Sequence, residues 1–187
     1  MKIAVYCASS MGKGHIYRDM AATLGRWLGR NGHTLIYGGG DAGLMGVVAQ
    51  AAYESGSHVI GVLPGNVSFI CDRPQPWCTE VLTESDMSAR KQRMLELADA
   101  FFALPGGTGT LDEMTEVITL TKIGVFRKPS VLIDLDGFYS PFRLMLDRMT
   151  ETGFIGPGEM EHVLFSDDLT EIDGFLKSYF AEADSHE

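Results

Sequence analysis

The residues with the clearest chemical potential lie in Pro105–Glu113, which reads PGGTGTLDE. They follow an apolar run, Ala100–Leu104, that predicts a buried strand, and they open a helical pattern that continues to Ile123. Glycines let a backbone approach an anion closely, and the free N–H groups at a helix start face that anion. We therefore expect a phosphate-binding turn. Two carboxylates, Asp112 and Glu113, are predicted on the first turn of the helix, which makes the segment a candidate reaction centre.

The positive charge that this turn lacks is found in Asp86–Met94, which reads DMSARKQRM. On a helix, Arg90 falls within one arc with Met87, Met94 and Leu97, so its guanidinium projects from an apolar face. A buried guanidinium requires an anionic partner, because an unpaired buried charge is very costly. That partner is either a structural carboxylate or a ligand, and the spacing alone leaves both open.

Glu113 repeats the pattern on the other helix, where it shares one face with Val117 and Leu120. Glu116 lies next to it at the i+3 position, whereas Asp112 is expected to face outward or to cap the helix start. Two core-facing groups of opposite charge beside a phosphate-type turn favour a reaction site over a purely structural ion pair.

Short apolar runs alternate with longer helical patterns along the chain, which predicts a doubly wound, Rossmann-like α/β fold with a mainly parallel sheet and helices on both faces. The predicted strands are Lys2–Ala8, Thr34–Tyr37, His58–Leu63, Ala100–Leu104, Ser130–Ile133 and His162–Phe165. The predicted helices are His15–Arg30, Gly43–Glu54, Asp86–Ala98, Gly109–Ile123, Tyr139–Thr152 and Leu169–Phe180. The segment Pro64–Leu82 is the longest one predicted to be irregular.

Four turns would follow strands of this sheet, and ligands bind beyond the carboxyl ends of such strands. They are Ser9–Gly14, Gly38–Gly43, the chain from Pro64 onward, and Pro105–Thr110, and we expect them to form one pocket. Gly38–Gly43 matches G-x-G-x-x-G, but no acidic residue ends the next strand, as binding of NAD would require. It is either a tight packing turn or a pocket wall. Ser9–Gly14 lacks the spacing of a P-loop.

Bulk composition narrows the class of protein. The chain has 187 residues and a formal net charge of −10, which argues against nucleic-acid and anionic-membrane partners. We expect a single domain over residues 1–180 and a frayed polar tail over residues 181–187. Three cysteines without metal spacing suit a cytoplasmic protein, and five histidines form no cluster. We expect no metal and no cofactor, and the sequence shows no nucleophile–base constellation.

These segments together resemble the LOG family, the cytokinin riboside 5′-monophosphate phosphoribohydrolases, which are often mislabelled lysine decarboxylases. The family motif P-G-G-x-G-T-x-x-E stands at Pro105–Glu113, and M-x-x-R-K-x-x-M stands at Met87–Met94. The Y-G-G-G-x-x-G-L-M-G element stands at Tyr37–Gly46. Downstream, K-P is Lys128-Pro129 and D-G-[FY]-Y is Asp136–Tyr139.

The resemblance implies a homodimer that hydrolyses the N-glycosidic bond of a nucleoside 5′-monophosphate, AMP or an N6-prenylated AMP, to free base and ribose 5-phosphate. It assigns catalytic roles to Arg90 and Glu113. The substrate-binding positions that it implies are Ser9, Gly40, Met45, Asp72, Met87, Lys91, Gly106, Gly107, Thr108, Gly109, Thr110, Leu111, Asp112 and Thr119. Residues 65–78 depart from the family pattern, which leaves the preferred base open.

Two other classes fit parts of the sequence. A non-catalytic carrier of a nucleotide or phosphorylated cofactor would use the same turn without cleaving its ligand. A pyridoxal-phosphate decarboxylase needs a Schiff-base lysine within a larger fold, and Lys91 on a charged helix is a poor candidate.

Overall fold

The strands of this protein are short runs of β-branched, aromatic and small apolar residues, and most are buried on both faces, as a sheet covered by two helical layers requires. The computed structural model describes residues 1–65 and 76–184. The strands are β1 (Lys2–Tyr6), β2 (Thr34–Tyr37), β3 (Val59–Pro64), β4 (Glu80–Glu84), β5 (Ala100–Ala103), β6 (Ser130–Leu132) and β7 (Val163–Phe165).

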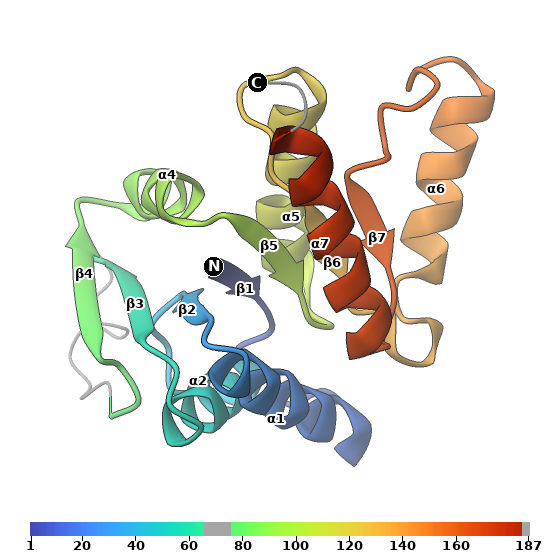
Figure 1. The fold of residues 1–187 in the computed structure, drawn as a ribbon. Helices are drawn as coiled ribbons and strands as arrows, with labels where there is room; N and C mark the ends of the chain where they lie inside the picture. The colour runs from blue at the N-terminus through green and yellow to red at the C-terminus, as the bar shows by residue number, and fades with distance from the viewer. Residues whose placement is uncertain (66–75, 185–187) are drawn as a thin grey trace.

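All seven strands join one parallel sheet in the order β4-β3-β2-β1-β5-β6-β7 (Figure 1). The chain builds the sheet outward from β1 to β4 and then returns through a helix to place β5 on the other side of β1. The strand order therefore reverses between β1 and β5. In open α/β sheets, this is the point where a crevice opens at the carboxyl ends of the strands.

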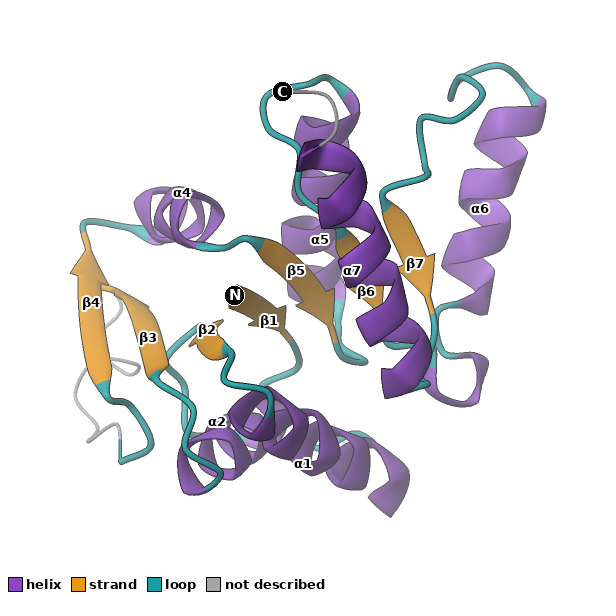
Figure 2. Ribbon diagram, in the orientation of Figure 1, coloured by secondary structure: helices purple, strands orange, loops and turns teal. Residues whose placement is uncertain are grey.

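The helices of the described residues cover both faces of the sheet (Figure 2). Their bounds are α1 (His15–Arg30), α2 (Gly43–Glu54), α4 (Met87–Leu97), α5 (Thr108–Lys122), α6 (Ser140–Glu151) and α7 (Leu169–Asp184), with a short 3₁₀ turn η1 (Leu135–Gly137). Alternation along β1 assigns the layers: Ile3 and Val5 share a buried cluster with α1, α2 and α7, whereas Ala4 and Tyr6 share one with α4 and α5. The doubly wound, mainly parallel fold predicted from the sequence is confirmed.

Two departures from the predicted elements have simple physical causes. The predicted irregular segment Pro64–Leu82 overlaps a strand, β4 (Glu80–Glu84), at the edge of the sheet. This strand is mostly exposed and has an acidic residue at each end, so its sequence contains no apolar run that would predict it. The last helix reaches Asp184, four residues beyond the predicted end at Phe180, so residues 181–184 are helical rather than a frayed tail. No helix in the described part of the chain combines the length and apolarity needed to cross a membrane.

Candidate active site

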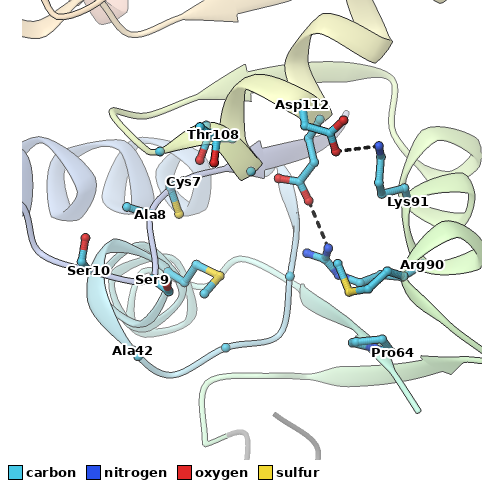
Figure 3. A pocket seen from close by; sticks show the side chains of 18 of the residues that line it. Cys7, Ala8, Ser9, Ser10, Ala42, Pro64, Arg90, Lys91, Thr108 and Asp112 are labelled. Atoms are coloured by element: carbon cyan, nitrogen blue, oxygen red, sulfur yellow. Dashed lines mark hydrogen bonds and ion pairs between the residues drawn. The ribbon is translucent and has the colours of Figure 1, made fainter. Parts of the chain in front are cut away.

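Four turns and the start of α4 enclose a pocket of about 640 Å³ at the carboxyl edge of the sheet (Figure 3). Their joint contribution to one pocket, predicted from the strand pattern, is confirmed. The lining residues are Cys7, Ala8, Ser9 and Ser10 after β1; Gly38, Gly40, Asp41, Ala42 and Met45 after β2; Pro64 at the end of β3; Met87, Arg90 and Lys91 on α4; and Gly107, Thr108, Gly109, Thr110, Asp112 and Glu113 after β5.

The glycine turn before α5 leaves the helix start open to the pocket. The helix begins at Thr108, and its N-cap residue Gly107 supplies no side-chain hydrogen bond. The first N–H groups of a helix have no intrahelical partner, so those of Thr108, Gly109 and Thr110 can face an anion in the pocket. Because the helix begins earlier than predicted, Asp112 and Glu113 lie on its second turn and not on the first.

Arg90 reaches this pocket from the buried face of α4. Asp86 caps that helix by accepting a hydrogen bond from the Ala89 N–H at 2.9 Å, which fixes where α4 begins. Arg90 is only 8% exposed. Its Nε donates to the carbonyl oxygen of Val62 at 3.0 Å, and its Nη1 donates to Glu113 Oε1 at 3.0 Å. The anionic partner that the spacing required is therefore Glu113, and the pair bridges α4 and α5.

Opposing effects act on the pKa of the Glu113 carboxyl group. Burial raises its pKa above the ordinary value, and the Arg90 guanidinium offsets part of that rise through its charge and its hydrogen bond. The side chain of Glu113 is 13% exposed, so it is shielded from bulk water yet open to the pocket. A carboxylate in such surroundings can stabilise a developing cation or accept a proton from water.

A second set of ion pairs joins the same two helices at the rim. Lys91 Nζ donates to Asp112 Oδ2 at 2.8 Å and to Glu116 Oε2 at 2.7 Å. Partial burial lowers the pKa of Lys91, but the hydrogen bonds to both carboxylates outweigh this and hold the pKa above its ordinary value. Asp112 is exposed at the rim, as predicted, and the Lys91 ammonium lies against its carboxylate beside the pocket (Figure 3).

Cys7 also lines the pocket and carries a titratable thiol. Burial raises the pKa of its thiol well above the ordinary range, and the charge of Glu113 raises it further. The thiol therefore stays neutral at physiological pH and is a poor nucleophile. The pocket offers an ion-paired carboxylate and hydrogen-bond donors, a set that suits general-base or electrostatic catalysis.

The predicted site residues divide into three groups. Twelve line the pocket: Ser9, Gly40, Met45, Met87, Arg90, Lys91, Gly107, Thr108, Gly109, Thr110, Asp112 and Glu113. Three others are absent from its lining: Gly106 packs against the Thr110 side chain, Leu111 joins the core between α5 and the sheet, and Thr119 is exposed on α5 and donates to the Thr115 carbonyl oxygen at 2.7 Å. Asp72 lies outside the described residues.

Sequence reasoning missed the groups that hold Arg90 in place. The Val62 carbonyl oxygen belongs to the backbone, so the type of residue at position 62 does not predict this contact. The sequence leaves two roles for the turn Gly38–Gly43, close packing or a wall of the pocket, and the structure supports both. Gly43 (φ 60°) packs its Cα against the backbone of Ser9 and Ser10, whereas Gly38 and Gly40 line the pocket.

The fold and the site define a Rossmann-like α/β protein with an open helix start and a buried guanidinium–carboxylate pair in one pocket. The family model described as "Possible lysine decarboxylase" matches residues 45–173. The chain is 41% identical over 181 residues to the rice (Oryza sativa subsp. japonica) cytokinin riboside 5′-monophosphate phosphoribohydrolase LOG, covering 97% of this chain and 74% of that protein. It is 40% identical to the Arabidopsis thaliana LOG3 enzyme of the same name, covering 95% and 82%. The chain belongs to the LOG family.

Solved structures of similar fold extend beyond that activity. The molybdenum cofactor binding protein of Rippkaea orientalis aligns with a TM-score of 0.70 at 20% identity, covering 96% of each chain. The molybdenum cofactor carrier protein of Chlamydomonas reinhardtii aligns with a TM-score of 0.69 at 23% identity, covering 96% of this chain and 98% of that one. At this level of identity the likeness shows the fold alone.

Proposed function

We propose that this protein is a phosphoribohydrolase that cleaves the N-glycosidic bond of a purine nucleoside 5′-monophosphate and releases the free base and ribose 5-phosphate. The observation that carries the proposal is the Arg90–Glu113 ion pair, buried beside the open start of α5 within one pocket. The relatives that are 37–41% identical over nearly the whole chain are named for this reaction, which supports the same assignment.

Each part of the site has a role in this reaction. Cleavage of a glycosidic bond develops positive charge on the ribose ring, and a carboxylate at Glu113 stabilises that charge and activates water for attack. Arg90 orients Glu113 through its hydrogen bond, and its positive charge favours the ionised form of the Glu113 carboxyl. The N–H groups of Thr108–Thr110 bind the 5′-phosphate, and that remote binding energy holds the ribose in position.

The separate sites for the phosphate and for the reacting bond determine which substrates fit. A 5′-monophosphate gains the helix start and Lys91 as partners, whereas an unphosphorylated nucleoside gains neither. We propose AMP and N6-prenylated AMP as substrates and cytokinin activation as the biological role, on the basis of the names of the relatives.

The purified protein should release free base from AMP and from isopentenyladenosine 5′-monophosphate, but not from the corresponding nucleosides. Chromatography of the products measures this directly, and relative rates rank the two bases. Release of base from the nucleosides at equal rates would remove the role assigned to the phosphate turn. Binding of AMP without any cleavage would instead identify a carrier, which is what the structurally similar protein of Chlamydomonas reinhardtii is named for.

We further propose that two copies of the chain associate through α6 and that the protein acts in the cytoplasm. Helix α6 lies at the β7 end of the sheet (Figure 1). It has no buried residue, although it carries several large apolar side chains. Leu144, Met145 and the following Phe154 are 67%, 53% and 79% exposed. Neighbouring large apolar side chains that are this exposed favour an interaction surface. Sedimentation velocity should give twice the 20.4 kDa chain mass, and the double change Leu144→Lys and Met145→Lys should return the monomer.

A further inference from the structure

The position of the Arg90 guanidinium is set by three different elements of the fold. Helix α4 supplies the side chain, the Val62 carbonyl oxygen at the end of β3 accepts from Nε at 3.0 Å, and Glu113 on α5 accepts from Nη1 at 3.0 Å. The remaining nitrogen, Nη2, lies against the Cα of Gly38 immediately after β2. The guanidinium therefore lies directly over the backbone at the carboxyl end of the sheet.

The backbone conformation at position 38 does not require a glycine. Its neighbour Gly39 has a φ of 73°, a left-handed value that favours glycine, but Gly38 does not have a positive φ. A Cβ atom added to Gly38 would overlap Arg90 Nη2 and would lie 3.4 Å from Arg90 Cζ. Its other near neighbour, Met45 Sδ, would be at 3.4 Å, an ordinary contact. The space above Gly38 is therefore filled by Arg90 itself.

We infer that Gly38 is a positioning residue for the Arg90–Glu113 pair: the missing side chain provides the space in which the guanidinium can donate to both Val62 and Glu113 at once. The catalytic consequence of this inference rests on the proposed phosphoribohydrolase activity, whereas the geometric part does not. With any larger residue at position 38, Nη2 must move away from the sheet. Since Nε and Nη1 belong to the same rigid plane, the bonds to Val62 and Glu113 move with it.

The Gly38→Ala variant should lower kcat for AMP by about 10- to 100-fold, the loss that follows a displacement of about 1 Å at a reacting group. The KM for AMP should change much less, because the phosphate turn after β5 does not touch Gly38. The acid limb of the pH–rate profile should move to higher pH, since a weakened bond to Arg90 lets burial raise the pKa of Glu113 further. The matched control is Gly174→Ala, a helical glycine in α7 with open space around it, which should leave all three unchanged.

A thermodynamic cycle separates this positioning role from a general packing role, and it does not depend on any enzymatic activity. Gly38→Ala is made in the natural chain and in an Arg90→Met chain, whose shorter side chain has no atom at the place of Nη2. We expect the drop in melting temperature caused by Gly38→Ala to shrink by at least about half in the Arg90→Met background, since residues in contact are energetically coupled. If Gly38→Ala alone does not fold, the change is placed in a chain that carries both Arg90→Met and Glu113→Gln, which has neither the guanidinium nor an unpaired buried carboxylate, and there it should fold.

If Gly38→Ala lowers the melting temperature equally in the natural chain and in the Arg90→Met chain, Gly38 serves backbone packing and the inference is overturned. An unchanged kcat in a folded Gly38→Ala variant would overturn its catalytic part. A natural chain that does not hydrolyse AMP would refute the proposed function, yet the cycle would still decide whether Gly38 positions Arg90.

Discussion

The Glu113→Gln variant should lose about 10²- to 10⁴-fold in the rate of AMP hydrolysis while it still binds AMP. Glutamine has the size of glutamate and can still accept the hydrogen bond from Arg90 Nη1. It cannot carry the negative charge that stabilises a cationic ribose, and it cannot take a proton from water. The phosphate turn is untouched, so binding and catalysis should separate. Product chromatography gives the rate, and calorimetric titration with AMP gives the affinity.

The control for this change is Glu116→Gln, one helical turn further along α5. Glu116 is also a carboxylate paired with a cation from α4, through its 2.7 Å contact with Lys91, but it does not line the pocket. Its neutralisation should change the rate only severalfold. A Glu113→Gln variant that turns over at the natural rate would contradict the assigned role. Equal losses in both variants would point to the electrostatics of the α4–α5 contact rather than to Glu113.

The predictable part of the fold is the part that hydrophobic burial dictates. β2, α1 and α2 begin and end where the apolar patterns do, and the other predicted elements differ mainly by a residue or two at their ends. β4 could not be predicted from its own residues, because an edge strand with acidic ends gains its pairing from β3 and not from burial. Its position depends on tertiary context.

The candidate site is likewise predictable where burial decides and not where tertiary context decides. Helical spacing identified Arg90 and Glu113 as buried charges in need of partners, since an unpaired buried charge is too costly. That they pair with one another, across α4 and α5, depends on the strand order that places β5 next to β1. The Val62 carbonyl oxygen and the space at Gly38 are properties of backbone geometry, which a sequence pattern does not encode.

The second large effect is expected from the Arg90→Met variant, in both stability and activity. Arg90 and Glu113 have side chains that are 10% and 13% exposed, so removing the guanidinium leaves a buried carboxylate and the Val62 carbonyl oxygen without their donor. Breaking a buried pair from one side costs about 3–5 kcal/mol of unfolding free energy. Urea denaturation measures this loss. Hydrolysis of AMP should fall together with it, because loss of the Arg90 charge raises the pKa of Glu113 further and so favours its neutral acid form.

The pH dependence of that loss identifies its cause. Without Arg90, burial alone acts on Glu113, and the pKa of its carboxyl rises further above its ordinary value of 4.5. A carboxyl whose pKa is raised in the folded state binds its proton more tightly there than in the unfolded chain, so stability falls as the pH rises from 4.5 through the folded-state pKa. The deficit of Arg90→Met should therefore be larger at about pH 8 than at about pH 5. In the double variant Arg90→Met with Glu113→Gln, no buried charge remains, so much of the stability should return without activity. A deficit that is the same at both pH values would mean that lost packing of the Arg90 side chain, and not the unpaired charge, destabilises the variant.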